Sequence, residues 1–546
     1  VKDGINERTI EAGINYYEFK YREADYGPYP KGLMYYLTMM DSWLYDETKP
    51  FIHIEAGDTF DELKKNARNG YFEKLIKEYL LDNNHKSIIS LVPEYGLEKE
   101  KEQKEADKLA EYKSTLTNDE LEELVKKTKE LKEYQDTPSS QEDLEKIPML
   151  ELSDIKREPA KDYNDVKSVD GIKIVHHNIF TNKIAYINMS FDTKCVPDEL
   201  IPYMGLLGST LSLMDTKNYT YPELTNEINI NCGGLATGTA LYSDKVDFSK
   251  NTIVYEVKSK ALYEKVPFVL GMMEEIMYNT RFDDYKRLKE IIARIKSRLE
   301  ASLMGQGHSI AMLECCAQFS ESAYYSDILR GYKYYEFIKK LDEEFEQNKT
   351  QIVDKLNKLV GYIFNKDNVI VSLTADDEGY DCFVKALSAK SCNIKDEHYN
   401  TAVRSFIPVN VKTGYTSASQ VQYVARCGNF VKDGYKYTGA LKVLKVIFSY
   451  DYLWINVRVK GGAYGCMSGS SRNGDFYMVS YRDPNLEKTN DIYEGAADYI
   501  RNFNVSRRDM VKFIIGTIGE IDAPLTPSAI GSRSFTHYMC NCTEDM

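Results

Sequence analysis

The order of strands and helices repeats in the second half of the chain, and this repeat limits the possible folds more than any other feature. Each of two glycine pairs, Gly233-Gly234 and Gly461-Gly462, is followed by a strand pattern and then by two helical patterns. The strands are predicted at 252–257 and 476–481, and the helices at 262–278, 285–304, 491–503 and onward from Ser506. The repeat predicts two similar α+β domains that pack against each other. A shared face or chamber between such domains is the geometric expectation.

Other elements complete this α+β pattern. Residues 171–180 and 184–192 read as two strands of a hairpin, because apolar and β-branched residues dominate both runs. Further strands are expected at 369–373 and 421–427, and further helices at 201–213, 221–230, 333–363, 379–389 and 441–457. The predicted fold class is α+β, with antiparallel sheets packed on helices.

The first 150 residues differ in character. Residues 1–95 have apolar positions at a 3.6-residue period and are predicted to be mostly helical, with a strand at 86–92. Glu and Lys dominate 96–134, which predicts a solvated pair of helices with their turn in the Ser114–Asn118 region. Thr117 or Asn118 is a suitable N-cap for the second helix, since acidic residues fill the turn that follows. This hairpin is expected to link two halves of a larger molecule.

Composition excludes several classes of protein. A net charge of −14 over 546 residues argues against nucleic-acid binding, which needs a positive surface. The longest apolar runs are far shorter than the roughly 20 residues of a membrane span, so no membrane partner is expected. The ten cysteines include no CxxC pair and are expected to be free thiols in a reducing compartment. Because the chain begins with Val1, it is expected to be part of a longer protein.

The most distinctive stretch is Arg458–Gly465, where a glycine pair separates a guanidinium from a phenol. If this stretch were extended, the even spacing would place Arg458 and Tyr464 on one face. Arg is a permanent cation and the Tyr hydroxyl is a neutral donor, so together they could hold a peptide carbonyl and stabilise an oxyanion. The spacing alone favours an ordinary turn at Gly461-Gly462, with a surface Arg and a packed Tyr.

The sequence contains no complete catalytic constellation. None of the seven histidines lies in His-Glu-x-x-His or His-x-x-Glu-His, the motifs that hold zinc on one helical face. His176 and His177 fall in a predicted strand and would point to opposite faces. Asp396-Glu397-His398 is expected to be an exposed loop. No phosphate-binding or dinucleotide-binding glycine motif and no Gly-x-Ser-x-Gly occurs.

Three stretches carry a resemblance that covers nearly the whole chain. They are 31–46 (KGLMYYLTMMDSWLYD), 458–465 (RVKGGAYG) and 514–527 (IIGTIGEIDAPLTP). With the repeat and the charged hairpin, they resemble the pitrilysin/insulinase clan of zinc metallopeptidases, and within it the presequence protease and falcilysin branch. In that family two halves, each of two related α+β domains, close around a chamber, and a helical hairpin joins them.

The resemblance implies a division of the chain and of the chemistry. The implied parts are the end of a second α+β domain (1–95), the hairpin linker (96–150), a third α+β domain (165–395) and a truncated fourth (400–546). Zinc would be held in the missing N-terminal half of the same polypeptide, and no cofactor or metal is expected in this chain. Arg458 and Tyr464 match the family's residues for substrate binding and transition-state stabilisation, with Gly461 and Gly462 as further substrate-binding positions.

The resemblance has one large departure. The helix predicted at 201–213 stands where the family's first domain carries its zinc motif, yet it reads YMGLLGS over 203–209 and offers no ligand or base. This chain is therefore expected to be inactive alone and to be the non-metal half of a zinc endopeptidase for short unfolded peptides. The alternatives are a non-catalytic peptide-binding partner or scaffold of the same clan, and a purely structural repeat protein. A bacterial cytoplasm is the expected location.

Overall fold

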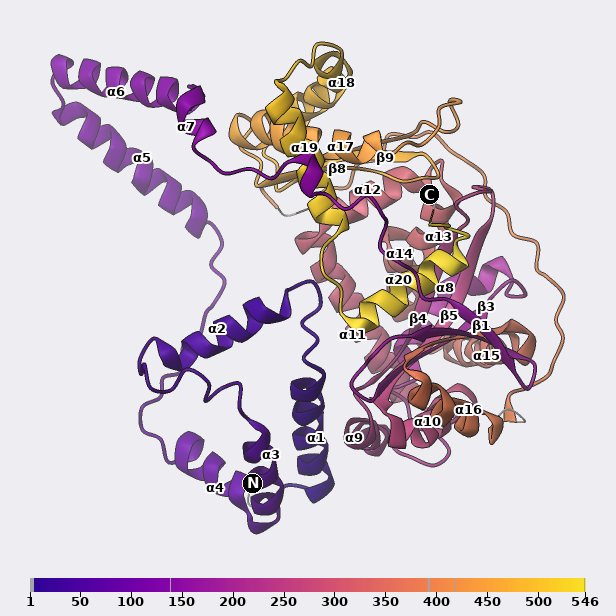
Figure 1. The fold of residues 1–546 in the computed structure, drawn as a ribbon. Helices are drawn as coiled ribbons and strands as arrows, with labels where there is room; N and C mark the ends of the chain where they lie inside the picture. The colour runs from indigo at the N-terminus through magenta and orange to yellow at the C-terminus, as the bar shows by residue number, and fades with distance from the viewer. Residues whose placement is uncertain (1–3, 138, 391–392, 418, 545) are drawn as a thin grey trace. The chain divides into compact units, whose positions relative to one another are not determined.

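The computed structural model describes residues 4–137, 139–390, 393–417, 419–544 and 546. These residues form two compact units (Figure 1). The larger unit combines the residues up to Tyr71 with those from Ile155 onward, and the smaller unit is Phe72–Asp154. The larger unit contains every strand of the described residues, so the predicted α+β character lies there.

A mixed sheet of six strands is the frame of the larger unit. Its order is β1-β2-β6-β3-β5-β4, with β1 (Asp165–Val169), β2 (Ile172–Asn178), β3 (Ile184–Asp192), β4 (Leu235–Ser243), β5 (Asn251–Leu262) and β6 (Val369–Ala375). All neighbouring strands are antiparallel except β2 and β6, which are parallel.

The predicted hairpin of 171–180 with 184–192 is wrong. Both strands form, but β6 lies between them and bonds to β2 on one side and β3 on the other. The reason is that nearly every residue of β6 is buried, and a strand buried on both faces belongs at the centre of a sheet. A strand far along the sequence therefore replaces the local pairing.

Nine α-helices among the described residues lie between β3 and the second sheet in the sequence. They are α8 (Ile201–Thr210), α9 (Tyr221–Asn231), α10 (Val266–Tyr278), α11 (Tyr285–Gly305), α12 (Gly307–Ala317), α13 (Glu321–Arg330), α14 (Tyr332–Glu343), α15 (Phe345–Ile363) and α16 (Asp377–Ser388). The predicted helices in this region are confirmed, with shifts of a few residues at their ends. The apolar faces of all of these helices except α12 form one large core with the sheet, which includes Leu206, Ile276 and Ile291. The predicted long helix at 285–304 is α11.

The opposite face of the sheet holds a smaller apolar cluster. Ile174 belongs to the large core, whereas its neighbour Val175 belongs to this cluster, because successive strand residues point to opposite faces. Phe535 of helix α20 (Pro527–Met539) packs there against Val175 and Tyr242. The C-terminal helix thus closes a face of a sheet whose strands lie hundreds of residues earlier.

A three-stranded antiparallel sheet follows, in the order β7-β9-β8. Its elements are β7 (Ala425–Asn429), α17 (Ala440–Ile447), the π-helix η8 (Phe448–Val459), β8 (Gly465–Ser470), β9 (Asp475–Tyr481), α18 (Glu487–Arg501) and α19 (Arg507–Ile521). In the order β3-β5-β4 the strand after Gly233-Gly234 is the outer one, and in β7-β9-β8 the strand after Gly461-Gly462 is the outer one. This shared order confirms the internal repeat.

Within the larger unit, α1 (Glu7–Glu23) is held to the six-stranded sheet and its helices by two ion pairs. Arg8 pairs with Glu227 of α9 at 2.6 Å, and Glu23 pairs with Lys260 of β5 at 2.6 Å. Helices α2 (Lys31–Trp43) and α3 (Gly57–Asn66) follow, then the short η1 (Ala67–Asn69) and α4 (Tyr71–Leu75). The predicted helical character of this segment is confirmed.

The smaller unit is dominated by two charged helices, α5 (Leu97–Thr115) and α6 (Asn118–Asp136), with η2 (Ile76–Leu81) before them and α7 (Gln141–Glu145) after them. Thr117 caps α6: its side chain accepts from the Glu120 N–H, and its own N–H donates to the Glu120 carboxylate. The predicted turn and N-cap are confirmed. The strand predicted at 86–92 is wrong, because Ile88 and Ile89 are exposed and residues 83–94 have no regular structure.

Candidate functional site

A tight turn ends η8 and leads into β8. Gly462 has a φ of +82°, a conformation that L side chains rarely adopt, and its N–H donates to the Arg458 carbonyl at 2.8 Å. Gly461 has no room for a side chain, since an added Cβ would lie 2.4 Å from the Val457 carbonyl oxygen. That oxygen already accepts a hydrogen bond from the Ala463 N–H at 3.1 Å. The space at this turn therefore requires glycine at 461, and the positive φ favours glycine at 462.

Arg458 and Tyr464 meet across the turn, although not as predicted. The stretch is not extended: Arg458 lies near the end of the π-helix and Tyr464 lies just before β8, so the condition for one shared strand face is not met. The turn brings them together instead, with the Arg458 guanidinium carbon 5.6 Å from the centre of the Tyr464 ring. The same carbon lies 4.0 Å from the ring centre of Trp454, one helical turn earlier. The cation is thus held between two aromatic rings.

Tyr464 has a fixed backbone and an exposed side chain. Its N–H is shared between the carbonyls of Tyr481 and Arg482, at 3.1 and 3.2 Å. Its ring meets the Tyr481 ring edge-on at 5.8 Å, while 67% of the residue remains exposed. The ring is therefore positioned from one side, and the residue remains largely open to solvent on the other.

Sequence reasoning missed the residues that support Tyr464. Tyr481 also packs against Tyr423 at 5.7 Å and against His308, the second residue of α12, at 4.9 Å. We call Tyr464, Tyr481, Tyr423 and His308 the aromatic cluster. Tyr481 lies opposite Gly465 in the pairing of β8 with β9, but no strand was predicted at 465–470, so the sequence did not indicate this neighbour. His308 comes from a helix more than 150 residues earlier and gave no signal in the sequence.

Two guanidinium groups and the buried carboxylate of Asp483 contribute charge to the site. Burial raises the pKa of the Cys466 thiol to about 11, against the opposing effect of the Arg458 cation, so this thiol stays neutral at pH 7. Arg482 places a second guanidinium 5.8 Å from the Tyr481 ring centre. Two permanent cations beside a phenol can bind carbonyl oxygens, a carboxylate or a developing oxyanion.

Gly461 and Gly462 have structural roles in this arrangement. The Gly461 carbonyl accepts a hydrogen bond from the Asn485 side chain at 2.6 Å, which ties the turn to the segment after β9. Gly462 is exposed, and a Cβ added there would meet the Pro484 ring at 3.5 Å. Their predicted contacts with a substrate remain a prediction.

Helix α8, which the sequence analysis compared with the helix that carries the family's zinc motif, cannot bind a metal. Leu206 and Leu207 of α8 are fully buried in the large core, and Gly205 lies against the Tyr334 ring. An apolar helix without imidazole or carboxylate donors cannot hold zinc. His176 and His177 lie on opposite faces of β2, as predicted: the first packs on Tyr380 of α16 and the second on Phe535 of α20. They cannot share one ion.

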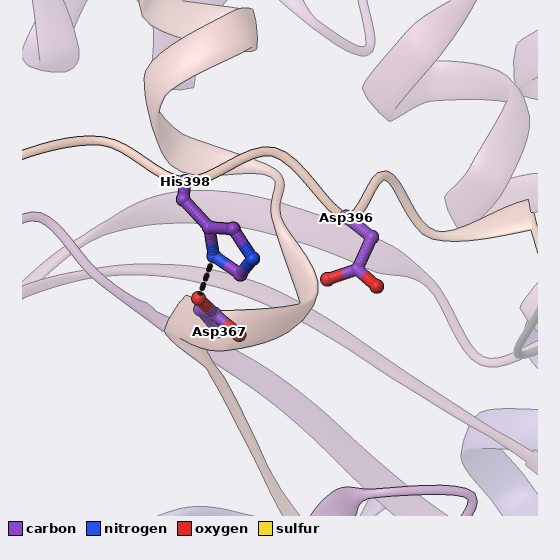
Figure 2. Close-up of side chains that lie close together, drawn as sticks. All are labelled: Asp367, Asp396 and His398. Carbon is purple, nitrogen blue, oxygen red and sulfur yellow. Dashed lines mark hydrogen bonds and ion pairs between the residues drawn. The ribbon is translucent and has the colours of Figure 1, made fainter.

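One group of possible metal ligands exists among the described residues (Figure 2). The possible ligand atoms of Asp367, Asp396 and His398 lie within 4.8 Å of one another, and the His398 ring is hydrogen-bonded to the Asp367 carboxylate. All three residues are exposed, and Asp396 and His398 belong to the loop predicted from the sequence. An exposed group of this kind is common without an ion, so we assign no metal site to it.

Two protein-family models match the chain. A domain model described as associated with peptidases of family M16, subgroup C, matches residues 91–341, and the model described as "PreP C-terminal domain" matches residues 414–546. Together they cover the smaller unit from residue 91, most of the six-stranded sheet with its helices, and the whole region of Arg458 and Tyr464. The chain belongs to the M16 family of peptidases, which are hydrolases of the insulinase-like type.

Relatives that are similar over the whole chain indicate its branch of the family. "Protein HypA" of Clostridium perfringens is 40% identical, covering all of this chain and 56% of the relative. "Presequence protease 1, chloroplastic/mitochondrial" of Arabidopsis thaliana is 30% identical, covering all of this chain and 51% of the relative. A crystal structure of a peptidase M16 inactive domain from Pseudomonas fluorescens aligns with a TM-score of 0.47 at 16% identity, over 70% of this chain and 89% of that one. The chain corresponds to the C-terminal half of the presequence-protease branch and spans about half the length of these two relatives.

The helices show one further property. Within the described ranges of the chain, every helix is too short or too polar to cross a membrane.

Proposed function

We propose that this chain is the non-metal half of a zinc-dependent endopeptidase that degrades short unfolded peptides in a closed chamber. Its contribution is to bind the peptide and to stabilise the transition state through Arg458 and Tyr464. The observation that supports the proposal is the placement of a guanidinium and an exposed phenol together, on a turn where Gly461 leaves no room for a side chain. The zinc chemistry belongs, in this proposal, to the N-terminal half of the same polypeptide.

Arg458 and Tyr464 have different chemical roles in this proposal. Arg458 is always charged and anchors a peptide carbonyl or a terminal carboxylate. Tyr464 donates the O–H hydrogen bond to the carbonyl oxygen that becomes negative when the peptide bond is attacked. Trp454 and Tyr481 hold these groups from the sides, which limits the reorganisation needed during the reaction.

The strand β8 offers a route for the peptide backbone. It is an outer strand of its sheet and begins directly after Tyr464. A peptide that adds to such an edge is held by main-chain hydrogen bonds, so binding depends little on its side chains. This geometry suits unfolded peptides and excludes folded proteins, whose backbones are already paired.

Replacement of Tyr464 by Phe in the full-length protein tests the proposal. The ring and its packing on Tyr481 remain, whereas the hydroxyl is removed. Loss of one oxyanion donor costs roughly 2.7–4 kcal/mol, so kcat should fall by about 10²- to 10³-fold with KM little changed. Tyr435→Phe is the matched control, because Tyr435 is equally exposed and lies away from the turn in sequence. An unchanged kcat in Tyr464→Phe would remove the catalytic role.

Peptide binding separates this proposal from its alternatives. Arg458→Ala should weaken peptide binding, measured by fluorescence anisotropy, whether the chain is half of an enzyme or a binding partner only. Arg501→Ala, at an exposed site on α18, should have no effect. Equal binding by the two variants would favour a purely structural role for the repeat.

A further inference from the structure

Cysteines from two distant parts of the chain meet beside the candidate site. Cys427 lies in β7, while Cys315 and Cys316 lie in the last turn of α12, and the backbones of these two elements approach within 8 Å. The Cys427 sulfur lies 3.7 Å from the Met312 carbonyl oxygen, one turn of α12 before the two cysteines. Cys427 also packs against the small apolar cluster that contains Cys316.

The three thiols are not equivalent. Cys316 is 4% exposed, whereas Cys315 and Cys427 are half-buried, so a small reagent can reach the latter pair more easily. A hydrogen bond from Cys427 lowers the pKa of the Cys315 thiol below its usual value. Hydrogen bonds with Cys315 and with Cys316, together with burial, raise the pKa of the Cys427 thiol. Cys315 is therefore the thiol that loses its proton first, and Cys427 keeps its proton beside it.

We propose that Cys315 and Cys427 form an oxidisable dithiol whose substrate is a small hydroperoxide. The Cys315 thiolate attacks one peroxide oxygen, the O–O bond breaks, and the other oxygen leaves as water or an alcohol after taking up a proton. The product is a sulfenic acid on Cys315. The Cys427 sulfur then attacks the Cys315 sulfur, the S–O bond breaks, and water leaves with the Cys427 proton. Two thiols lose two electrons in total, and the peroxide gains them.

The resulting disulfide would tie α12 to the three-stranded sheet. Cys427 is paired with Tyr477 of β9, the strand that ends at Tyr481. At the other end of α12, about 10 Å away along the helix, His308 packs against the same Tyr481. Oxidation would thus fix, by a covalent bond, the two elements that support the aromatic cluster. The chemistry of the dithiol does not depend on the proposed function.

Peptide mapping after oxidation tests this proposal in the full-length polypeptide that carries the chain. The reduced protein is treated with hydrogen peroxide, alkylated and digested with trypsin. Cleavage after Arg426 and Lys432 releases a short peptide with Cys427, and cleavage after Arg298 and Arg330 releases the one with both α12 cysteines. The expected result is a cross-link between these peptides that is lost in Cys315→Ser and in Cys427→Ser. It should persist in Cys316→Ser and in the control Cys382→Ser.

Two outcomes overturn the proposal. One is the absence of the cross-link in the unmodified protein, with Cys315 oxidised further to a sulfinic acid. The other is a cross-link that persists in Cys315→Ser, which would assign the reaction to Cys316. If a serine variant does not fold, the alkylation rate of Cys315 in Cys427→Ala provides a second measurement. That rate at pH 7 should fall below the rate of the unmodified protein, and an equal rate would contradict the role of Cys427.

Discussion

Replacement of Gly461 by Ala tests the turn that unites Arg458 and Tyr464. The added Cβ would lie 2.4 Å from the Val457 carbonyl oxygen and 3.0 Å from that of Asn456. Both are backbone atoms, so the turn itself must move. Forcing a methyl group into such a space costs about 1–3 kcal/mol, and weakening the Ala463 to Val457 hydrogen bond adds about 1 kcal/mol. The expected destabilisation is therefore about 2–4 kcal/mol.

Trp454 provides a local measurement of this effect. The chain has two tryptophans, so a Trp43→Phe background leaves Trp454, next to Arg458, as the single tryptophan, whose emission is excited selectively beyond the absorption of tyrosine. At an m-value of about 2 kcal/mol/M, the fluorescence transition of Gly461→Ala should move to lower urea by roughly 1–2 M. Gly462→Ala should cost less, about 1–2 kcal/mol, because only its positive φ is unfavourable.

Gly519→Ala is the matched control. Gly519 lies within α19, and an added Cβ there meets no atom within 4 Å. Alanine is the better helix former by about 0.8–1 kcal/mol, so this variant should be as stable as the unmodified chain or slightly more stable. If Gly461→Ala and Gly519→Ala unfold at the same urea concentration, the steric account of the turn is refuted.

Two further predictions concern stability. Burial lowers the pKa of His177 from 6.5 to about 4. The neutral imidazole therefore stabilises the fold above pH 6.5, and this stabilisation, about 3 kcal/mol, is lost as the pH falls toward 4. Urea unfolding at several pH values should show this loss in the unmodified chain and in the exposed-site control His53→Gln, but not in His177→Gln. Lys260→Met leaves the buried Glu23 carboxylate unpaired and should destabilise the attachment of α1 by up to about 3 kcal/mol, seen as faster amide exchange in α1. Lys183→Met, in an exposed pair, should not change that exchange, and equal exchange in both variants would contradict the prediction.

Local sequence signals predicted local structure well. The apolar period of 285–304 corresponds to α11, and the Thr117 signal corresponds to a capping box with Glu120. These features depend on residues within one or two helical turns of each other, so the sequence contains all the information needed. The repeat was also predictable, because the order of elements does not depend on which strands become neighbours.

Long-range partners could not be predicted in the same way. The pairing of β6 with β2 and β3 depends on strands almost 200 residues apart, and no pattern within 171–192 indicates it. At the candidate site, Arg458 and Tyr464 are neighbours, but the proximity predicted from the sequence required an extended segment. The structure brings them together by a turn at the end of a π-helix instead. His308 was missed since its contact with Tyr481 is purely tertiary.

The central place of β6 has a consequence for how the protein is made. Roughly 180 residues separate the end of β3 from the start of β6, which is roughly 10 to 40 s of synthesis at the usual rates. During that time β2 and β3 each lack a neighbour on one side, and unpaired apolar strands readily bind other chains. We expect the nascent chain to depend on chaperones in this interval. Any fragment that ends before Val369 would lack the middle of its main sheet.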